Sequence, residues 1–377
     1  MATQCFQNGR ILTSAGEVRT LSFDNGAVAD LRWRRRAEQT VDLEGDYLIP
    51  GLVELHTDNL EKHFVPRTGV SWPVGLSAVV AHDVHMVGSG VTTVFDAVTV
   101  GEPGDKHMRK EIFHSSLGAL EDAEQAGLLR ADHYLHLRCE LAGDDVIERI
   151  EPLVERKNLR LFSVMDHTPG QRQWRDIEAY KRYTNLEHEP EELIKARING
   201  LCALQAKNAK SNLREIIALC RKNGFPLASH DDTTVEHVRE NAARGMRIAE
   251  FPTTLEAARE ARSLGLAIVM GAPNVVRGGS HSGNVAAVDL ARENLLDILS
   301  SDYMPASLLH AAFMLPELAG IPLAEALRTV TLAPAKAVGL EDRGELAPGK
   351  RADAVRVRLV NNVPMVRAVW REGVQVL

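Results

Sequence analysis

Eight short apolar runs alternate with longer helical stretches between Ile49 and about Ala337, and this alternation is the strongest constraint on the fold. Such a pattern is typical of βα units whose strands pair in parallel, and eight strands are the number that closes a barrel. The sequence therefore predicts a (β/α)8 barrel of the TIM type. The runs are Leu52 to His56, Thr92 to Val98, Tyr134 to Leu141, Leu159 to Asp166, Pro226 to Ser229, Ile248 to Phe251, Ala267 to Gly271 and Ile298 to Ser301. Helices are expected between them, for example over Leu76 to Gly88 and over Glu189 to Asn223, where Gly224 is a typical helix stop.

Both ends of the chain have a different pattern. Residues 1–48 contain short β-like pieces separated by Asn-Gly and Glu-Gly turns, and the last 26 or so residues, about 352–377, alternate apolar and polar side chains with a period of two. We expect these strands to pair into one composite β-sandwich domain made of residues 1–48 and 345–377. The catalytic barrel would then comprise residues 49–344.

Composition excludes several classes of protein. The formal net charge of −7 argues against bulk binding to nucleic acid, which normally needs a basic surface. No apolar window is long enough to span a membrane, so no membrane association is expected. The four cysteines form no C-x-x-C pair, which favours free thiols in a reducing compartment. We therefore expect a cytoplasmic protein.

The triplet His56-Thr57-Asp58 lies directly after the first apolar run and is the clearest chemical signal. Alternate side chains of a strand point the same way, so His56 and Asp58 would project together an imidazole nitrogen and a carboxylate oxygen. Further candidate ligands stand at the ends of later runs, and a barrel brings those ends into one ring. The predicted metal ligands, which could hold one or two divalent cations with zinc as the first choice, are His56, Asp58, Glu140, His167, His230 and Asp302.

Two of these acids have a more specific expected role and a simpler alternative. Glu140 could bridge two cations, or it could form a salt bridge with Arg138. Asp302 could act as a general base, because a cation lowers the pKa of its bound water toward ~7 and a nearby carboxylate can take the proton. The alternative for Asp302 is a helix cap ahead of Met304.

The loops at the expected barrel mouth are rich in cations and glycines. Guanidinium groups and glycine backbone amides match phosphate oxygens, so these loops could form a phosphate cradle. The alternative is a set of flexible loops whose cations face solvent. The candidate substrate-binding residues are Lys62, His63, Arg67, Lys106, Arg172, Asn274, Arg277, Gly278, Gly279 and His281.

Two segments connect these observations with a known group of enzymes. The stretches LIPGLVELHTD and GELAPGKRADAVRV, together with the ligands at the strand ends, resemble the amidohydrolase superfamily over essentially the whole chain. The resemblance implies a metal-bearing barrel joined to a small β-sandwich from both termini. Other stretches, such as HTDNLEKHFVPR, SVMDHTPGQRQ and APNVVRGGSHSGN, resemble a branch that serves phosphonate catabolism. That branch implies a small phosphorylated sugar as substrate and the release of pyrophosphate.

The sequence departs from the commonest pattern of this superfamily in its ligands. Asp58 replaces the second histidine of the first strand, and Glu140 replaces the carboxylated lysine that many members use. Hard oxygen ligands in both places could shift the metal preference from zinc toward manganese or another ion. Glu140 and His167 also fall on the third and fourth runs, one earlier than usual, so either a strand is miscounted or the ligand strands differ.

Other functions fit parts of the pattern. An amidohydrolase that cleaves a C–N bond, such as a deaminase, cyclic amidase or deacetylase, would use the same metal site with a different substrate cradle. A catalytically inactive scaffold is the third alternative, which the presence of all six ligand types disfavours. Related barrels often form dimers, so a homodimer is expected by analogy.

Overall fold

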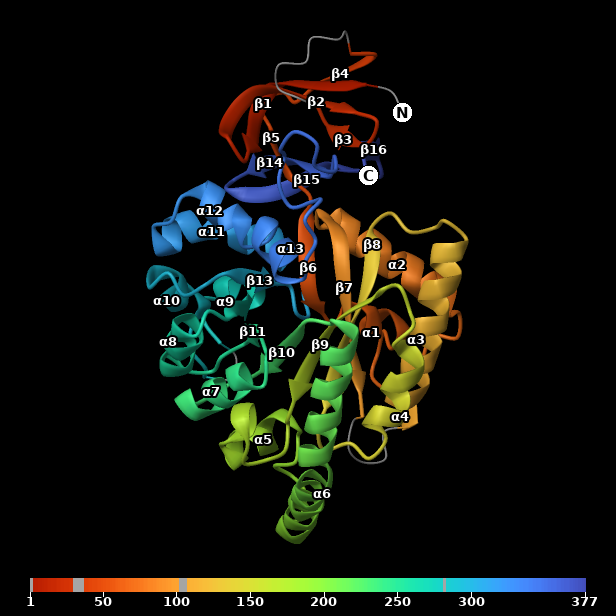
Figure 1. Ribbon diagram of the computed structural model, residues 1–377, viewed down its shortest axis with the longest axis vertical. Helices are drawn as coiled ribbons and strands as arrows, with labels where there is room; N and C mark the ends of the chain where they lie inside the picture. The colour runs from red at the N-terminus through yellow and green to blue at the C-terminus, as the bar shows by residue number, and fades with distance from the viewer. Residues whose placement is uncertain (1–2, 30–36, 102–106, 281–282) are drawn as a thin grey trace.

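The computed structural model describes residues 3–29, 37–101, 107–280 and 283–377. Two eight-stranded sheets dominate these residues, and the sheet formed by both termini lies at one end of the other sheet (Figure 1). The helices of the middle part of the chain surround the second sheet.

The second sheet is the barrel that the alternating runs predict. Its strands are all parallel and follow the chain in order, β6-β7-β8-β9-β10-β11-β12-β13. Between the first and last strand, a parallel bridge joins Thr57 to Asp302. The strands are β6 (Leu52–Thr57), β7 (Val91–Val100), β8 (Asp132–Glu140), β9 (Leu159–Met165), β10 (Leu227–His230), β11 (Ile248–Glu250), β12 (Ala267–Gly271) and β13 (Ile298–Ser300).

The helices cover the barrel because one face of each strand is apolar. On β8, for example, Leu135, Leu137 and Cys139 join the outer core, whereas the alternate residues Arg138 and Glu140 line the cavity inside. The helices are α1 (Asn59–Phe64), α2 (Gly75–Gly88), α3 (His107–Gln125), α4 (Val146–Ile150), α5 (Ile177–Tyr183), α6 (Glu191–Asn223), α7 (Val235–Ala243), α8 (Leu255–Ser263), α9 (Ala272–Arg277), α10 (Ala287–Arg292), α11 (Ser307–Ala319), α12 (Leu323–Arg328) and α13 (Leu332–Ala337), with 3-10 turns η1 (Glu151–Leu153) and η2 (Arg172–Trp174).

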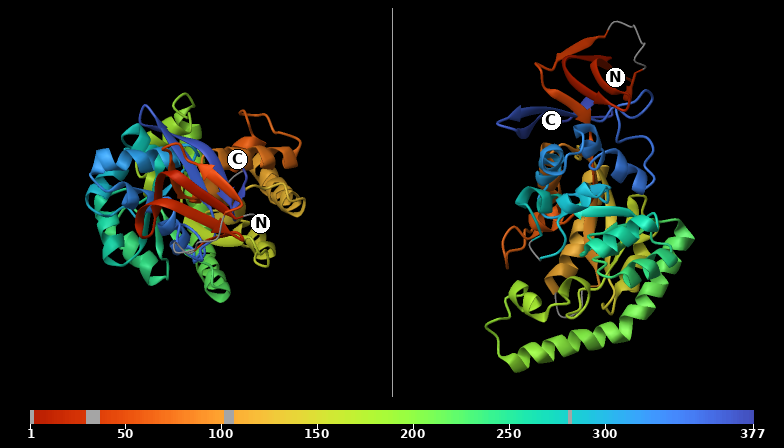
Figure 2. Two further views of the ribbon diagram at one scale, coloured as in Figure 1. Left: turned by 90° about the horizontal axis from the view of Figure 1, so that it is seen from above. Right: turned by 90° about the vertical axis from the view of Figure 1, so that its left-hand side faces the viewer.

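Helix α6 is the longest, and it ends at Gly224 as predicted. The backbone of Gly224 has φ 71°, the left-handed conformation that glycine adopts without strain and that commonly terminates helices. The C-terminal half of α6 packs against the barrel through Ile216 and Cys220. Its N-terminal half extends beyond the barrel, at the end of the molecule opposite the terminal sheet (Figure 2).

The sheet from both termini confirms that the two ends of the chain fold together. Its order is β16-β15-β14-β5-β1-β2-β3, with β4 paired to β1. Strands from both ends share one apolar core that includes Phe6, Phe23, Leu48, Ala354 and Trp370. The strands are β1 (Gln4–Thr13), β2 (Gly16–Asp24), β3 (Ala27–Val28), β4 (Gln39–Asp42), β5 (Tyr47–Pro50), β14 (Ala354–Val360), β15 (Val363–Arg371) and β16 (Val374–Gln375).

Gly51 is the single residue between the last N-terminal strand of this sheet, β5, and the first barrel strand, β6. Its N–H donates to the carbonyl of Asp353 at 2.9 Å, which ties the junction to β14. A Cβ atom at this position would lie 2.3 Å from the Oγ1 atom of Thr92, so only glycine fits. This close approach fixes where the chain passes from one sheet into the other.

All four cysteines are free thiols. Among the described residues, no helix combines the length and apolar character that a membrane span requires.

Candidate metal centre

One cavity of about 1180 Å³ opens among the C-terminal ends of the barrel strands. In parallel barrels these ends are where side chains from distant parts of the chain meet, and the strand arrows in Figure 1 end there. The structure brings all six predicted metal ligands to the wall of this cavity: His56, Asp58, Glu140, His167, His230 and Asp302. Glu140 lies on the third strand and His167 follows the fourth, so the strand count from the sequence was correct.

The first group of possible ligands consists of His56, Asp58 and Asp302, which offer one atom each within 4.8 Å of one another. The Nε2 atom of His56 lies 3.9 Å from Oδ1 of Asp58. Backbone hydrogen bonds hold the group together, because Asp58 donates to the carbonyl of Asp302 at 2.8 Å and Asp302 donates to that of His56 at 3.0 Å. Asp302 does not cap the next helix, because α11 begins at Ser307 and has Ala306 as its N-cap residue. Burial and the nearby Asp58 carboxylate raise the pKa of Asp302.

The second group consists of His167, His230 and Asp231. The Nε2 atoms of the two histidines lie 3.7 and 3.6 Å from Oδ2 of Asp231. Asp231 is not among the ligands that the sequence predicts, although it directly follows His230 at the end of a strand. Position alone gave no reason to prefer it over the adjacent Asp232, which instead accepts a hydrogen bond from Ser229.

Carboxylates close to the Nδ1 atoms of the three histidines orient their imidazole rings. Glu140 accepts hydrogen bonds from both the backbone N–H and Nδ1 of His167, at 3.1 and 2.7 Å. Glu250 approaches Nδ1 of His56 and Nδ1 of His230, at 3.2 and 3.3 Å. All three rings consequently direct Nε2 toward the cavity. Glu140 orients His167 in this arrangement, and its predicted role as a bridging ligand stays a prediction.

The pKa values of Glu250 and His167 depend on their burial and on the charged groups close to them. Burial opposes charge on Glu250, but the surrounding imidazoles of His136, His56 and His230 keep its pKa well below the ordinary value. For His167, burial likewise opposes the charged ring, while the Glu140 carboxylate raises its pKa. Carboxylates and imidazoles that hold one another in this way are common where histidines bind a metal.

The backbone is strained at the cavity wall. Asp231, Phe251 and Asp302 all have φ 53°, the left-handed region that side-chain-bearing residues rarely adopt. The ring of Phe251 packs edge-on against His56 and His230, with centroids 5.0 and 5.2 Å apart. Strain of this kind persists where the surrounding structure enforces it and concentrates at functional sites.

Arg138 adds a positive charge at the floor of the cavity. Its side chain is only 14% exposed, and its Nη1 atom donates to Oδ1 of Asp58 at 2.5 Å. The salt bridge between Arg138 and Glu140 that the sequence left open is replaced by this pair with Asp58. The sequence suggests Arg138 only as a partner for an acid, whereas in the structure it lines the cavity.

A further cluster of possible ligands lies outside this cavity and consists of His82, Asp96 and His133. Asp96 accepts from His82 at 2.6 Å and from His133 at 2.8 Å. The remaining ring nitrogens contact Asn59 and Asp83, so the named atoms already satisfy one another. This buried network joins α2 to β7 and β8, which favours a structural role for it.

The predicted substrate-binding residues divide into three sets. Asn274, Arg277 and Gly279 line the cavity. Lys62, His63, Arg67, Arg172 and Gly278 are not among the residues that line it. Lys106 and His281 lie outside the described residues.

Local contacts explain the second set. The Nη1 atom of Arg172 donates to the carbonyl of His230 and to Oδ1 of Asp232, at 2.8 and 2.6 Å, so Arg172 holds the His230 loop in place. His63 packs against the rings of His82 and His85 on α2. The amino group of Lys62 donates to the carbonyl of Tyr303, and Arg67 lies on an exposed loop.

The cavity thus combines three imidazole nitrogens, several carboxylates and arginines within one enclosure. Such a donor set fits divalent cations, and the arginines suit an anionic substrate. The arrangement can position a water molecule, remove its proton at a carboxylate and neutralise negative charge that develops on a substrate.

Comparisons with known proteins agree with this geometry. The Amidohydrolase family pattern matches residues 117–377. A relative from Escherichia coli strain K12, named alpha-D-ribose 1-methylphosphonate 5-triphosphate diphosphatase, is 46% identical over 364 residues, which cover 95% of each chain.

Solved structures share the fold at much lower identity. An N-acetyl-D-glucosamine-6-phosphate deacetylase from Mycobacterium smegmatis is 17% identical, with a TM-score of 0.61 and full coverage of both chains. An amidohydrolase from an environmental sample of the Sargasso Sea is also 17% identical, with a TM-score of 0.65, covering 100% of this chain and 93% of the other. At this identity the two structures support the fold alone.

Proposed function

The chain belongs to the amidohydrolase family, and from this premise we propose that it hydrolyses α-D-ribose 1-methylphosphonate 5-triphosphate to the 5-phosphate and pyrophosphate. The enzyme is a metal-dependent hydrolase of phosphonate catabolism. The observation that carries the proposal is the 46% identity to the E. coli diphosphatase over 95% of the chain. A cavity with both candidate metal ligands and arginines supports it.

Two cation positions are proposed at the cavity floor. His56, Asp58 and Asp302 hold one, and His167, His230 and Asp231 hold the other, with Glu140 beside His167. Zinc is the proposed ion because imidazole nitrogens suit it well, although the carboxylates also suit manganese. Bound divalent cations supply charge neutralisation at phosphate oxygens and lower the pKa of water in the site.

Asp302 is the proposed general base. Its carboxyl is buried beside Asp58, and both conditions raise its pKa, which favours proton uptake. The water oxygen bonds to phosphorus while Asp302 takes a proton from it, and the P–O bond that joins the α- and β-phosphates breaks, which separates pyrophosphate from the 5-phosphate. Because pyrophosphate is a stable anion, positioning and charge neutralisation contribute more than protonation of the leaving group.

We propose that the triphosphate contacts arginine side chains at both ends of the cavity. Arg138 lies at the floor beside Asp58, and Arg277 lies at the wall together with Asn274 and Gly279. Guanidinium forks and backbone amides match phosphate oxygens in geometry and charge. Contacts to the substrate from Lys62, His63, Arg67, Lys106, Arg172, Gly278 and His281 stay predictions.

An assay of pyrophosphate release tests the function. The purified protein, supplied with zinc or manganese, is incubated with the triphosphorylated sugar phosphonate, with ribose 5-triphosphate, with ATP and with an N-acetylated sugar phosphate. We expect pyrophosphate from the sugar phosphonate at the highest kcat/KM. Cleavage of the amide without pyrophosphate release would replace the proposal by C–N bond hydrolysis.

Three properties of the whole protein are proposed alongside the activity. We place the division between the terminal β-sandwich domain and the barrel at residues 48/49 and 344/345, close to the passage between the two sheets at Gly51. A homodimer is proposed by analogy with related barrels, and light scattering of the purified protein tests it. The four free thiols support a reducing cytoplasmic compartment.

A further inference from the structure

Glu250 occupies an unusual position between the two groups of metal ligands. It ends the sixth barrel strand and is 1% exposed. Its Oε1 atom lies 3.2 Å from Nδ1 of His56, and its Oε2 atom lies 3.3 Å from Nδ1 of His230. The two imidazoles stack with their centroids 5.6 Å apart and their planes inclined by 24°. One carboxylate therefore contacts a histidine from each group.

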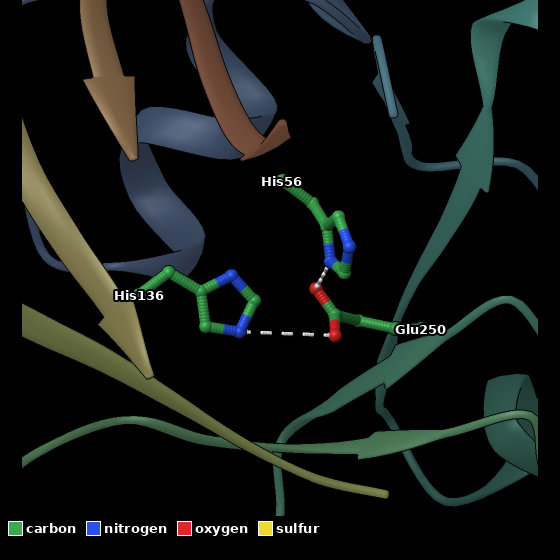
Figure 3. Close-up of side chains that lie close together, drawn as sticks. All are labelled: His56, His136 and Glu250. Atoms are coloured by element: carbon green, nitrogen blue, oxygen red, sulfur yellow. Dashed lines mark hydrogen bonds and ion pairs between the residues drawn. The ribbon is translucent and has the colours of Figure 1, made fainter. Parts of the chain in front are cut away.

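His136 closes the space behind this carboxylate. Figure 3 shows the rings of His56 and His136 turned toward Glu250. The Nδ1 atom of His136 lies 2.9 Å from the carbonyl of Leu55, which can only accept, so Nδ1 carries the proton. Its Nε2 atom is then the acceptor for the hydroxyl of Ser163 at 2.9 Å. His136 thus has its own hydrogen-bond partners. Its Nε2 atom lies 3.9 Å from Oε2 of Glu250, the longer contact dashed in Figure 3, which exceeds hydrogen-bond distance, so His136 does not replace His56 or His230 as a hydrogen-bond partner of Glu250.

We propose that Glu250 is a positioning residue that fixes the tautomer of both His56 and His230 and so couples the two cation positions. A carboxylate only accepts hydrogen bonds, so each ring donates Nδ1–H to it. A neutral imidazole carries a single N–H, which leaves the Nε2 lone pair of both rings directed into the cavity. The inference rests on the metal-binding role in the proposed function and adds a residue that acts through His56 and His230.

The substitution Glu250→Gln tests this role because it preserves size. The amide oxygen can still accept Nδ1–H from one ring, but the amide nitrogen donates to the other ring and forces its proton onto Nε2. That Nε2 atom then lacks a lone pair for a metal. We expect zinc affinity to fall about 10- to 100-fold, as is typical when a carboxylate behind a histidine ligand is lost.

The first of two measurements on the full-length protein is its zinc affinity. Competition titration with a zinc chelator compares wild type, Glu250→Gln and the control Ser163→Ala. The control alters the support of His136 in the same buried region and is expected to change zinc affinity less than twofold. Circular dichroism verifies that each variant is folded. Equal zinc affinity of wild type and Glu250→Gln would overturn the inference.

Nitrogen-15 NMR of the metal-free wild type, at a pH high enough to keep both rings neutral, reads the tautomers directly. We expect Nδ1–H on both His56 and His230, and Nε2–H on either ring would overturn the inference even if Glu250→Gln does not fold. Neither measurement involves the triphosphate. A protein that shows these tautomers and whose zinc affinity depends on Glu250, yet releases no pyrophosphate, refutes the proposed function and leaves this inference intact.

Discussion

The Oε2 atom of Glu54 accepts a hydrogen bond of 2.6 Å from the backbone N–H of Ser301, 247 positions later in the chain. The other oxygen of Glu54 accepts from the backbone N–H of His56 at 2.7 Å. The carboxyl is completely buried between the first and last barrel strands, next to the bridge that joins Thr57 to Asp302. Glu54 therefore helps to close the barrel directly beneath the candidate metal centre.

Replacing Glu54 by alanine is expected to destabilise the protein. The change leaves two buried N–H groups without their acceptor, each at a cost of about 1–3 kcal/mol, and opens a small cavity. We expect the free energy of unfolding to fall by about 2–5 kcal/mol in urea denaturation. The exposed Glu148 on α4 offers a matched control, since Glu148→Ala should change it by less than about 0.5 kcal/mol. Equal stability of the two variants would show that Glu54 does not close the barrel.

The buried His133 predicts a specific dependence of stability on pH. Burial opposes its charge, but the carboxylates of Asp96 and Asp83 raise its pKa to about 10 from an ordinary value of 6.5. Because the folded pKa is the higher one, the stabilisation is fully present below about pH 6.5 and is lost as pH rises toward 10.

The measurement compares wild type with His133→Gln in urea denaturation at pH 6, 8 and 10. The difference in the free energy of unfolding should be largest at pH 6 and should shrink steadily toward pH 10. His114 is exposed on α3, so His114→Gln should change the free energy of unfolding by less than about 0.5 kcal/mol. A difference for His133→Gln that does not change with pH would mean that the ring is uncharged in the folded protein.

Asp302→Asn tests the general base. Asparagine keeps the shape and one coordinating oxygen but cannot take a proton at neutral pH. We expect kcat for pyrophosphate release to fall about 10²- to 10⁴-fold while bound zinc, measured by atomic spectroscopy, is retained. Turnover at the wild-type rate would remove Asp302 from this role. Loss of zinc together with turnover would assign the effect to the metal-binding role of Asp302 and not to proton transfer.

The sequence predicted the barrel, the pairing of the two termini and six residues of the cavity wall because these depend on local patterns. Apolar alternation marks strands, and strand ends meet in a barrel whatever the details of the loops. Glu250 obeys the same strand-end rule, but its role depends on which atoms of His56 and His230 face it. Periodicity contains no information on such contacts.

The cationic residues of the loops also show what a sequence pattern cannot predict. Arg172 and Arg277 look alike in the sequence, since each follows a barrel strand. In the structure Arg172 pairs with the buried Asp232, whereas Arg277 lines the cavity. The difference arises because a carboxylate from the next βα loop happens to reach one guanidinium and not the other. Only the tertiary arrangement separates a structural arginine from a candidate substrate contact.

Arg138 is predicted to contribute to catalysis through its position at the cavity floor. Its guanidinium is held by Asp58 in a largely buried place, where a fixed positive charge stabilises developing negative charge more strongly than in water. Arg138→Met keeps much of the apolar volume and removes the charge. We expect kcat/KM for the triphosphate to fall about 10²- to 10³-fold, and Arg138→Lys to recover part of the loss.

The matched control is Arg197→Met, because Arg197 lies at the exposed outer wall of the same cavity on α6. Solvent screens its charge, so kcat/KM should change less than tenfold. Zinc content is measured for both variants, because Arg138 contacts a candidate ligand and its loss could act through the metal. A fall in kcat/KM with unchanged zinc places the effect on the substrate. If Arg138→Met retains the wild-type kcat/KM, the guanidinium serves only to hold Asp58. The positive charge that neutralises the triphosphate then comes from the metal ions and from cationic side chains at the mouth of the cavity.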